Sequence, residues 1–199
     1  MAGRNSKRAF VVKEMKRQFL HLVIGLSMSL LIYFHYAPAY IPGIIAIIGF
    51  GLSVWHDKRG IPILGYFLKE VDRNDFLPGY GAISLMGGIF IAFMFFPVDF
   101  AFIAAITLSI VDSFATAFGL FLGEEGKKSV WASTTGGIIN IAFFTSFFTY
   151  IPVTYAVVGT FAGAAAELFY KKWYFIDDNL IIPIVAGLVL IAVKAIFAG

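Results

Sequence analysis

The run VDFAFIAAITLSIVDSFATAFGLFL, residues 98–122, decides what kind of protein this chain is. Its charged side chains are Asp99, beside the start, and Asp112, in the interior. An apolar run of about 20 residues is long enough to cross the ~30 Å hydrocarbon core of a bilayer as an α-helix. The run therefore predicts a membrane-spanning helix that carries one carboxylate inside it.

Six further apolar stretches flank this one, at residues 19–36, 39–55, 79–96, 134–150, 152–169 and 180–197. Hydrophobic residues make up 60% of the chain and charged residues 14%, against about 45–50% and 25% in soluble domains. Prolines mark three of the short turns, at Pro38, Pro97 and Pro152. There is no cysteine, which excludes disulfides and thiolate-bound metals. We predict an all-α integral membrane protein with about seven transmembrane helices.

The basic residues predict its orientation. With the N-terminus inside, 14 of the 15 Lys and Arg residues fall in the arm and loops of one side, and Lys194 alone falls toward the other. Such an excess marks the cytoplasmic side, so the N-terminus is expected inside and the C-terminus outside. Residues 1–17 form a basic amphipathic arm without the features of a cleaved signal peptide, and residues 18–199 form a single transmembrane catalytic domain. The net charge of +3 gives no indication of nucleic-acid binding.

The acidic residues follow the same division, although the positive-inside rule does not govern them. Eleven of the 12 Asp and Glu residues lie in the inner loops or in the helix stretches that lead to them, with Asp99 as the exception. A simple membrane spacer has no need of this clustering. It indicates a site for cations and phosphates at the cytoplasmic face.

Asp112 is the most informative single residue. It lies about ten residues from the inner end of its stretch, or roughly 15 Å deep at 1.5 Å per residue. A carboxylate at that depth costs several kcal/mol unless it faces a polar cavity or a cation. Ser109, Thr116 and Gly119 share its helix face by their spacing. The alternative is a structural Asp112, bonded to neighbouring helices or protonated.

The loop that follows has the composition of a phosphate-binding loop. Gly123-Glu124-Glu125-Gly126-Lys127-Lys128-Ser129 leads to Ser133 and a Thr-Thr-Gly-Gly run. Glycines let backbone N–H groups approach an anion, and lysine supplies a positive charge. The spacing is not that of a Walker P-loop. Loops of this composition also join membrane helices without any such role.

Three further groups are candidates for the same site. Asp177-Asp178-Asn179 offers hard oxygen ligands for Mg²⁺, or simply an N-cap for the last helix. Glu167 is a second carboxylate within an apolar stretch, with Lys171 four residues on as a possible structural partner. Arg17 and His21 share one face of the first helix and can bind phosphate and accept a proton; otherwise they are interfacial side chains.

Taken in order, these pieces resemble the CTP-dependent lipid kinases, the family of dolichol kinase, phytol kinase and yeast-type diacylglycerol kinase. The family pattern has an Arg…His pair, a Pro-Gly step, a D-x-x-A-x-x-x-G-x-x-x-G helix, a Lys-Ser/Thr loop and a terminal D-D-N-x-x-x-P. The matching residues are Arg17, His21, Pro78-Gly79, Asp112, Ala115, Gly119, Gly123, Lys128-Ser129, Ser133, Glu167, Asp177-Asp178-Asn179 and Pro183. Trp131-Ala132 stand where the pattern has Glu-Gly. The resemblance covers nearly the whole chain.

The resemblance implies transfer of the γ-phosphoryl group of CTP to a lipid alcohol, such as a polyprenol, dolichol or diacylglycerol, at the cytoplasmic face. It implies catalytic roles for Asp112, Lys128, Arg17 and His21. It implies Mg²⁺ as cofactor, with the metal ligands Asp112, Asp177, Asp178 and Glu167. It implies nucleotide binding by Gly119, Gly123, Lys128, Ser129, Ser133 and Asn179. His21 or one of the carboxylates would accept the hydroxyl proton.

Two other functions fit the same sequence features. A phosphatidate-type cytidylyltransferase, which makes a CDP-lipid, also needs CTP, Mg²⁺ and membrane carboxylates. A transporter could use Asp112 and Glu167 as ligands within the membrane. The gathering of charge at one face and the lack of an obvious inverted repeat favour the enzyme.

Overall fold

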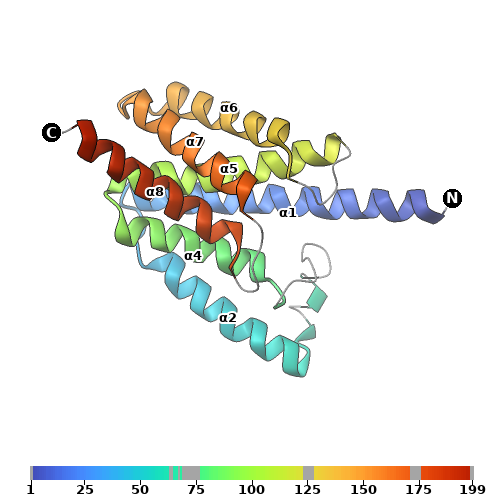
Figure 1. Cartoon of the computed structure of the whole chain (residues 1–199). Coiled ribbons are helices and arrows are strands. Elements are labelled where there is room, and N and C mark those ends of the chain that lie inside the picture. The colour runs from blue at the N-terminus through green and yellow to red at the C-terminus, as the bar shows by residue number, and fades with distance from the viewer. Residues whose placement is uncertain are drawn as a thin grey trace.

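The computed structural model describes residues 2–62, 65–66, 68, 77–122, 128–170 and 176–197, with side chains from residue 8 onward. This part of the chain forms seven helices, arranged as a bundle with the two termini at opposite ends (Figure 1). The helices are α1 (Ala2–Tyr33), α2 (Ile41–Arg59), α4 (Tyr80–Phe95), α5 (Val98–Phe121), α6 (Val130–Phe147), α7 (Val153–Phe169) and α8 (Asp178–Phe197). The predicted all-α class is confirmed for these residues.

Three of the described helices are long and apolar enough to cross a membrane, over Arg8–Tyr33, Val98–Phe121 and Asp178–Phe197. Two more, α4 and α7, are apolar but have 16 and 17 residues. At 1.5 Å per residue they extend about 25 Å, less than the ~30 Å hydrocarbon core. The chain is thus a helical membrane protein with three full-length candidate spans, and the other helices fall short of the length or apolarity predicted from their sequence stretches.

Helix α5 forms the centre of the bundle. It packs against α1, α4, α6, α7 and α8, and its side chains from Phe100 to Val111 are buried on every face. This follows from a sequence that is apolar all round rather than along one stripe. Small residues on its neighbours permit close approach. A Cβ on Gly25 of α1 would lie 2.2 Å from Ser109 Oγ, and one on Gly163 of α7 would lie 2.4 Å from Thr107 Cγ2.

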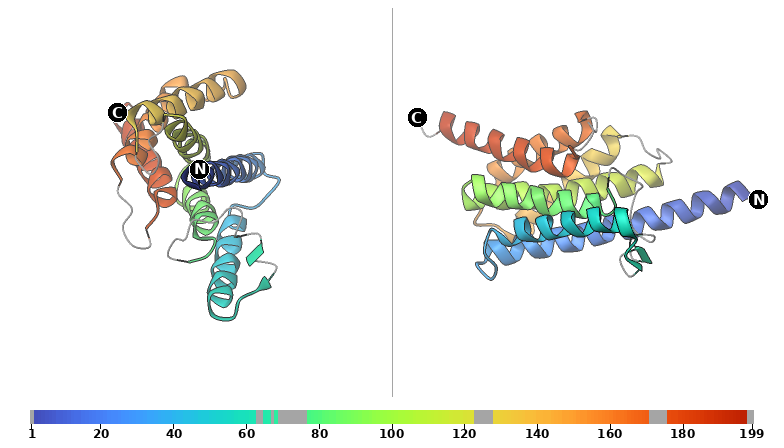
Figure 2. Two further views of the ribbon diagram at one scale, coloured as in Figure 1. Left: turned by 90° about the vertical axis from the view of Figure 1, so that its right-hand side faces the viewer. Right: turned by 90° about the horizontal axis from the view of Figure 1, so that it is seen from below.

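Helix α2 packs against α4 and stands at the edge of the bundle, on the side away from α6 (Figure 2). The two helices touch closely near the start of α2, where a Cβ on Gly43 would lie 2.7 Å from a ring carbon of Phe90. The turn before α2 contains Pro38, and Pro97 and Pro152 directly precede α5 and α7. These prolines stand in the tight reversals that the sequence predicts.

The basic arm and the first predicted span form one continuous helix, α1, whose N-terminal end projects beyond the other helices (Figure 1). At its far end Tyr33 stacks on Phe102 of α5, with ring centroids 4.0 Å apart, and its hydroxyl donates to Asp99 Oδ1 at 2.9 Å. Helix α1 is therefore fixed against α5 at its C-terminal end. This register brings Arg17 and His21 to the level of Asp112.

Candidate functional site

A cavity of about 1230 Å³ lies between α1, α2, α4, α5, α7 and α8. It exceeds the roughly 300–1,000 Å³ of a pocket for one drug-sized ligand. Ten of the twelve site residues predicted from the sequence line it: Arg17, His21, Asp112, Gly119, Lys128, Ser129, Glu167, Asp177, Asp178 and Asn179. Of the other two, Ser133 lies behind Glu167, and Gly123 falls outside the described residues.

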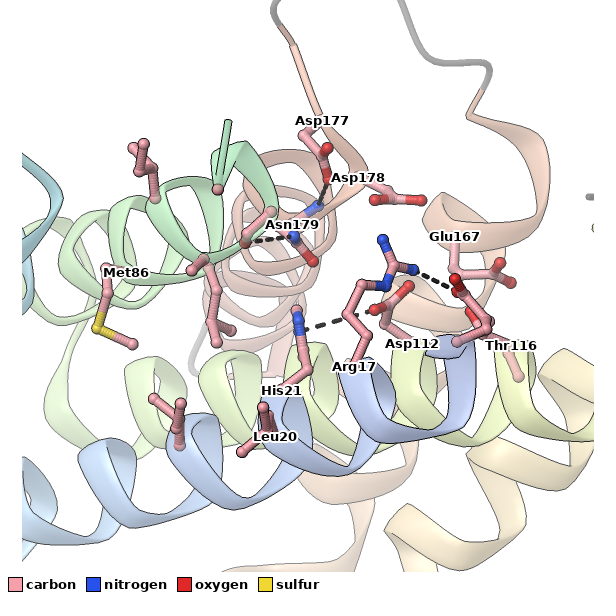
Figure 3. A pocket seen from close by; sticks show the side chains of 18 of the residues that line it. Arg17, Leu20, His21, Met86, Asp112, Thr116, Glu167, Asp177, Asp178 and Asn179 are labelled. Atoms are coloured by element: carbon pink, nitrogen blue, oxygen red, sulfur yellow. Dashed lines mark hydrogen bonds and ion pairs between the residues drawn. The ribbon is translucent and has the colours of Figure 1, made fainter. Parts of the chain in front are cut away.

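Helices α1 and α5 place the first polar group. His21 Nε2 lies 3.6 Å from Asp112 Oδ2, and both side chains are about nine-tenths buried. One turn earlier, Arg17 Nη2 donates to Glu14 Oε1 at 2.6 Å. The buried Nε of Arg17 has no hydrogen-bond acceptor among the described residues. Figure 3 shows Arg17 and His21 reaching from α1 toward Asp112. A proton acceptor, a carboxylate and a guanidinium thus face one space.

Lys128 connects the segment before α6 to α7 and α8. Its Nζ lies 2.9 Å from Asp178 Oδ2 and 3.5 Å from Glu167 Oε1, and it also donates to the backbone carbonyl of Glu167. Burial lowers the pKa of Lys128, but the charges of Asp178 and Glu167 outweigh this, so the pKa lies above its ordinary value. Lys128 is consequently a permanent cation between two carboxylates at neutral pH.

The start of α6 and the end of α5 complete this side of the cavity. Ser133 donates to Glu167 Oε2, which fixes that carboxylate against α6. Ser129 is buried and precedes the first residue of α6. Gly119 is buried, yet a Cβ added to it would meet none of the described residues within 4 Å. The cavity therefore begins directly at the Gly119 backbone, and any side chain there would take up ligand space.

The residues of the Asp177-Asp178-Asn179 motif have different roles. Asp177 Oδ1 accepts from the Asn179 backbone N–H at 3.1 Å, so this residue caps α8 as the alternative interpretation proposed. Pro183 lacks the N–H that would bond to the Asn179 carbonyl four residues earlier. That carbonyl lies against α4, where a Cβ on Gly88 would come within 2.1 Å of it. The spacing from Asn179 to Pro183 thus allows α8 to start close against α4.

This close contact sets the direction of the Asn179 side chain. Its Nδ2 donates to Ser84 Oγ at 3.0 Å and to the Gly81 carbonyl at 3.3 Å, both on α4. With both donors directed to α4, Oδ1 faces the cavity, and it has no donor among the described residues. A buried carbonyl oxygen without a donor carries a desolvation cost of about 1–3 kcal/mol. It is a prepared acceptor for a cation, a water or a ligand hydroxyl.

Two participants were missed from the sequence. Glu14 holds the Arg17 guanidinium, and its spacing of three residues within one helix is a signal that could have found it. Ser84 fixes the Asn179 amide, and it has no sequence signal because its partner is 95 residues away. Both act by orienting residues that face the cavity.

The donor set suits a hard divalent cation bound together with a phosphate ligand. Among the described residues, no three His, Asp or Glu side chains gather closely enough to hold a metal by themselves. Mg²⁺ in nucleotide sites takes one or two carboxylates and completes its shell with phosphates and water. Asp112, Asp178 and Asn179 Oδ1, to which no described group donates, all face the cavity and supply oxygen ligands of this kind.

Comparison with known proteins finds sequence similarity but does not indicate a function for this chain. The chain is 27% identical over 185 residues to an uncharacterized protein of Methanocaldococcus jannaschii, covering 90% of this chain and 93% of the other. No protein-family model matches the chain. No solved structure matches it either.

Proposed function

We propose that this protein is a membrane lipid kinase that transfers the γ-phosphoryl group of CTP to a lipid alcohol. The main observation in support of the proposal is the set of residues that lines one cavity. Residues predicted from five separate sequence segments line it, and its polar end continues into an apolar groove between α1, α2 and α4. A polar donor and an amphiphilic acceptor fit the two ends of such a space.

The charges of the cavity support a metal-bound nucleotide. Among the described lining residues there are five carboxylates and two permanent cations: Glu14, Asp112, Glu167, Asp177 and Asp178, with Arg17 and Lys128. A bare triphosphate would be repelled by this balance. Bound Mg²⁺, held by Asp112, Asp178 and Asn179 Oδ1, would neutralise charge on the phosphates. We therefore expect the donor to bind together with its cation.

The chain's own residues would then position the reactants, which is the main requirement of phosphoryl transfer. Lys128 and Arg17 are placed to bind phosphate oxygens, with Gly119 and Ser129 forming the adjacent wall. The acceptor hydroxyl lies beside the His21–Asp112 pair. Its oxygen attacks the γ-phosphorus, the bond from that phosphorus to the β-bridging oxygen breaks, and CDP leaves. The His21 imidazole takes the hydroxyl proton, and Asp112, 3.6 Å from it, stabilises the imidazolium that forms.

The proposed topology places this cavity at the cytoplasmic face. Seven crossings, with the N-terminus inside and the C-terminus outside, agree with the termini lying at opposite ends of the bundle. The shorter helices would cross where neighbouring helices shield their ends from lipid. CTP would then reach the cavity from the cytoplasm, and the lipid alcohol would reach it from the bilayer.

The test is product analysis with purified protein in lipid vesicles, Mg²⁺, a panel of lipid alcohols and CTP labelled at both the γ-phosphorus and the cytidine. A kinase moves γ-label alone into the lipid fraction and releases CDP. Cytidine in the lipid fraction, with pyrophosphate released, would establish the cytidylyltransferase instead. Solute flux into the vesicles without CTP consumption would establish a transporter.

A further inference from the structure

The apolar half of the cavity forms a groove with walls from three helices. Leu20, Ile24 and Met28 line it at spacings of four residues along α1. The opposite walls are formed by Ile45 and Gly49 of α2 and by Ala82, Ile83, Leu85 and Met86 of α4. The groove begins beside His21, where the polar end of the cavity stops.

The groove has a closed far end. Met28 packs against the buried cluster that contains Met86, Ile32 and Ile89, so the bundle core closes the space below them. Met28 lies seven positions after His21 along α1, which at 1.5 Å per residue gives a length of about 10 Å. Methionine side chains are flexible and polarizable, and they adapt to straight and branched chains alike.

Among the described residues, nothing closes the groove along its side. Leu20, Ile24 and Ile45 line it, and they keep 42%, 44% and 42% of their surface exposed. Helix α2 packs on α4 and diverges from α1 (Figures 1 and 2). In a membrane protein the space between these two helices faces lipid. A hydrocarbon chain can therefore enter sideways from the bilayer while its head group stays at the polar end.

We infer that this groove holds the first part of the acceptor's hydrocarbon chain, delivered through the lateral opening between α1 and α2. The inference rests on the proposed function and adds the binding site of the acceptor. The groove is continuous with the polar end of the cavity, and this continuity indicates that its occupant is the lipid alcohol. One end of the space offers His21 and Asp112 to a hydroxyl, and the other offers apolar side chains over two helical turns. Chain beyond this length leaves through the opening into the bilayer.

Two pairs of neighbouring residues allow a matched test. Ile24 and Val23 on α1 are 44% and 42% exposed, and Ile45 and Ile44 on α2 are 42% and 46% exposed, but in each pair the first residue alone lines the groove. We expect Ile24→Trp and Ile45→Trp to raise the apparent KM for a long-chain lipid alcohol about tenfold or more, equivalent to losing the burial of about two methylene groups. Val23→Trp and Ile44→Trp should leave it unchanged, and the KM for CTP should not change in any of the four.

A second measurement does not depend on turnover. A long-chain alcohol with a photoreactive diazirine on its first carbons, incorporated into phosphatidylcholine vesicles, should label peptides 20–28 and 45–49, and Ile24→Trp should reduce that labelling. Labelling in the groove without phosphoryl transfer would refute the proposed kinase function but would support the groove as a binding site for the hydrocarbon chain. Phosphoryl transfer with wild-type KM values in both groove variants, or labelling spread evenly over lipid-facing helices, would overturn the groove.

Discussion

Replacement of Asp112 by asparagine separates a catalytic role from a structural one. The two side chains have the same shape, and residue 112 is 8% exposed, so the change alters charge and little else. In the proposed reaction the carboxylate stabilises the charged His21 and helps to hold the phosphate-bound cation. A structural Asp112 would instead contribute chiefly to the stability of the bundle.

The two roles predict different magnitudes. Losing one preorganised charge that acts on the transition state costs about 3–4 kcal/mol, or roughly 10²–10³-fold in kcat. Folding stability should hardly change. The Asp112 side chain is buried next to His21 and shares the cavity with Asp178 and Arg17. Its neutralisation therefore relieves desolvation and like-charge repulsion while it loses attractions. A net change within about 1 kcal/mol corresponds to a shift of no more than about 4 °C in Tm for a chain of this size.

The assay is γ-label transfer in vesicles, run beside thermal unfolding of the same preparations. Asp99→Asn is the matched control because it neutralises the other carboxylate of α5, in the first turn of the helix, where its partner is Tyr33. The control should keep wild-type turnover. Near-normal turnover in Asp112→Asn, or a loss of turnover that merely follows a loss of folded protein, would refute the catalytic role.

Three further predictions concern the same cavity. Gly119→Leu should raise the KM for CTP at least tenfold with the fold intact. Gly51, which likewise has no described neighbour within 4 Å, lies outside the cavity, so Gly51→Leu should leave the KM unchanged. Equal KM values in the two variants would contradict this prediction. Lys128→Met should lower the free energy of unfolding at pH 7 by about 2 kcal/mol, since it breaks partly buried ion pairs. Because the pKa of Lys128 is raised above 10.5 in the fold, the stability that its ion pairs contribute is present below that pH and is lost as the pH rises through the raised value. Denaturant titrations should thus show the stabilities of wild-type protein and Lys128→Met converging at high pH. A stability difference that persists at high pH would contradict the role of the ion pairs. Chelation with EDTA should abolish CTP binding in equilibrium dialysis, and restored Mg²⁺ should recover it; binding unaffected by EDTA would contradict the charge argument.

Much of the helical layout could be predicted from apolar runs and prolines. The predicted stretch 98–122 became α5 at Val98–Phe121, and 152–169 became α7 at Val153–Phe169. The predicted stretch 134–150 starts four residues after α6 does, because the residues from Lys128 to Ser133 had the composition of a phosphate-binding loop. In the structure Ser133 is helical and donates to Glu167.

The residues of the site could be predicted from the sequence better than the contacts among them. Motif spacing indicated Asp112, Lys128 and Glu167 because charged residues in or beside apolar stretches are costly and therefore conspicuous. Spacing could not reveal that Asp177 caps a helix while Asn179 presents an oxygen that no described group donates to, since the difference depends on contacts from α4. The divergence of α2, which opens the groove, depends likewise on the close packing of Gly43 on Phe90.

The fate of the γ-phosphorus tests the central claim most directly. Wild-type protein in vesicles with Mg²⁺, a long-chain lipid alcohol and γ-labelled CTP should produce a labelled phospholipid and unlabelled CDP, and Asp112→Asn should produce neither above background. Label that stays in CTP, or appears solely as inorganic phosphate or pyrophosphate, would contradict the assignment of this cavity to lipid phosphorylation.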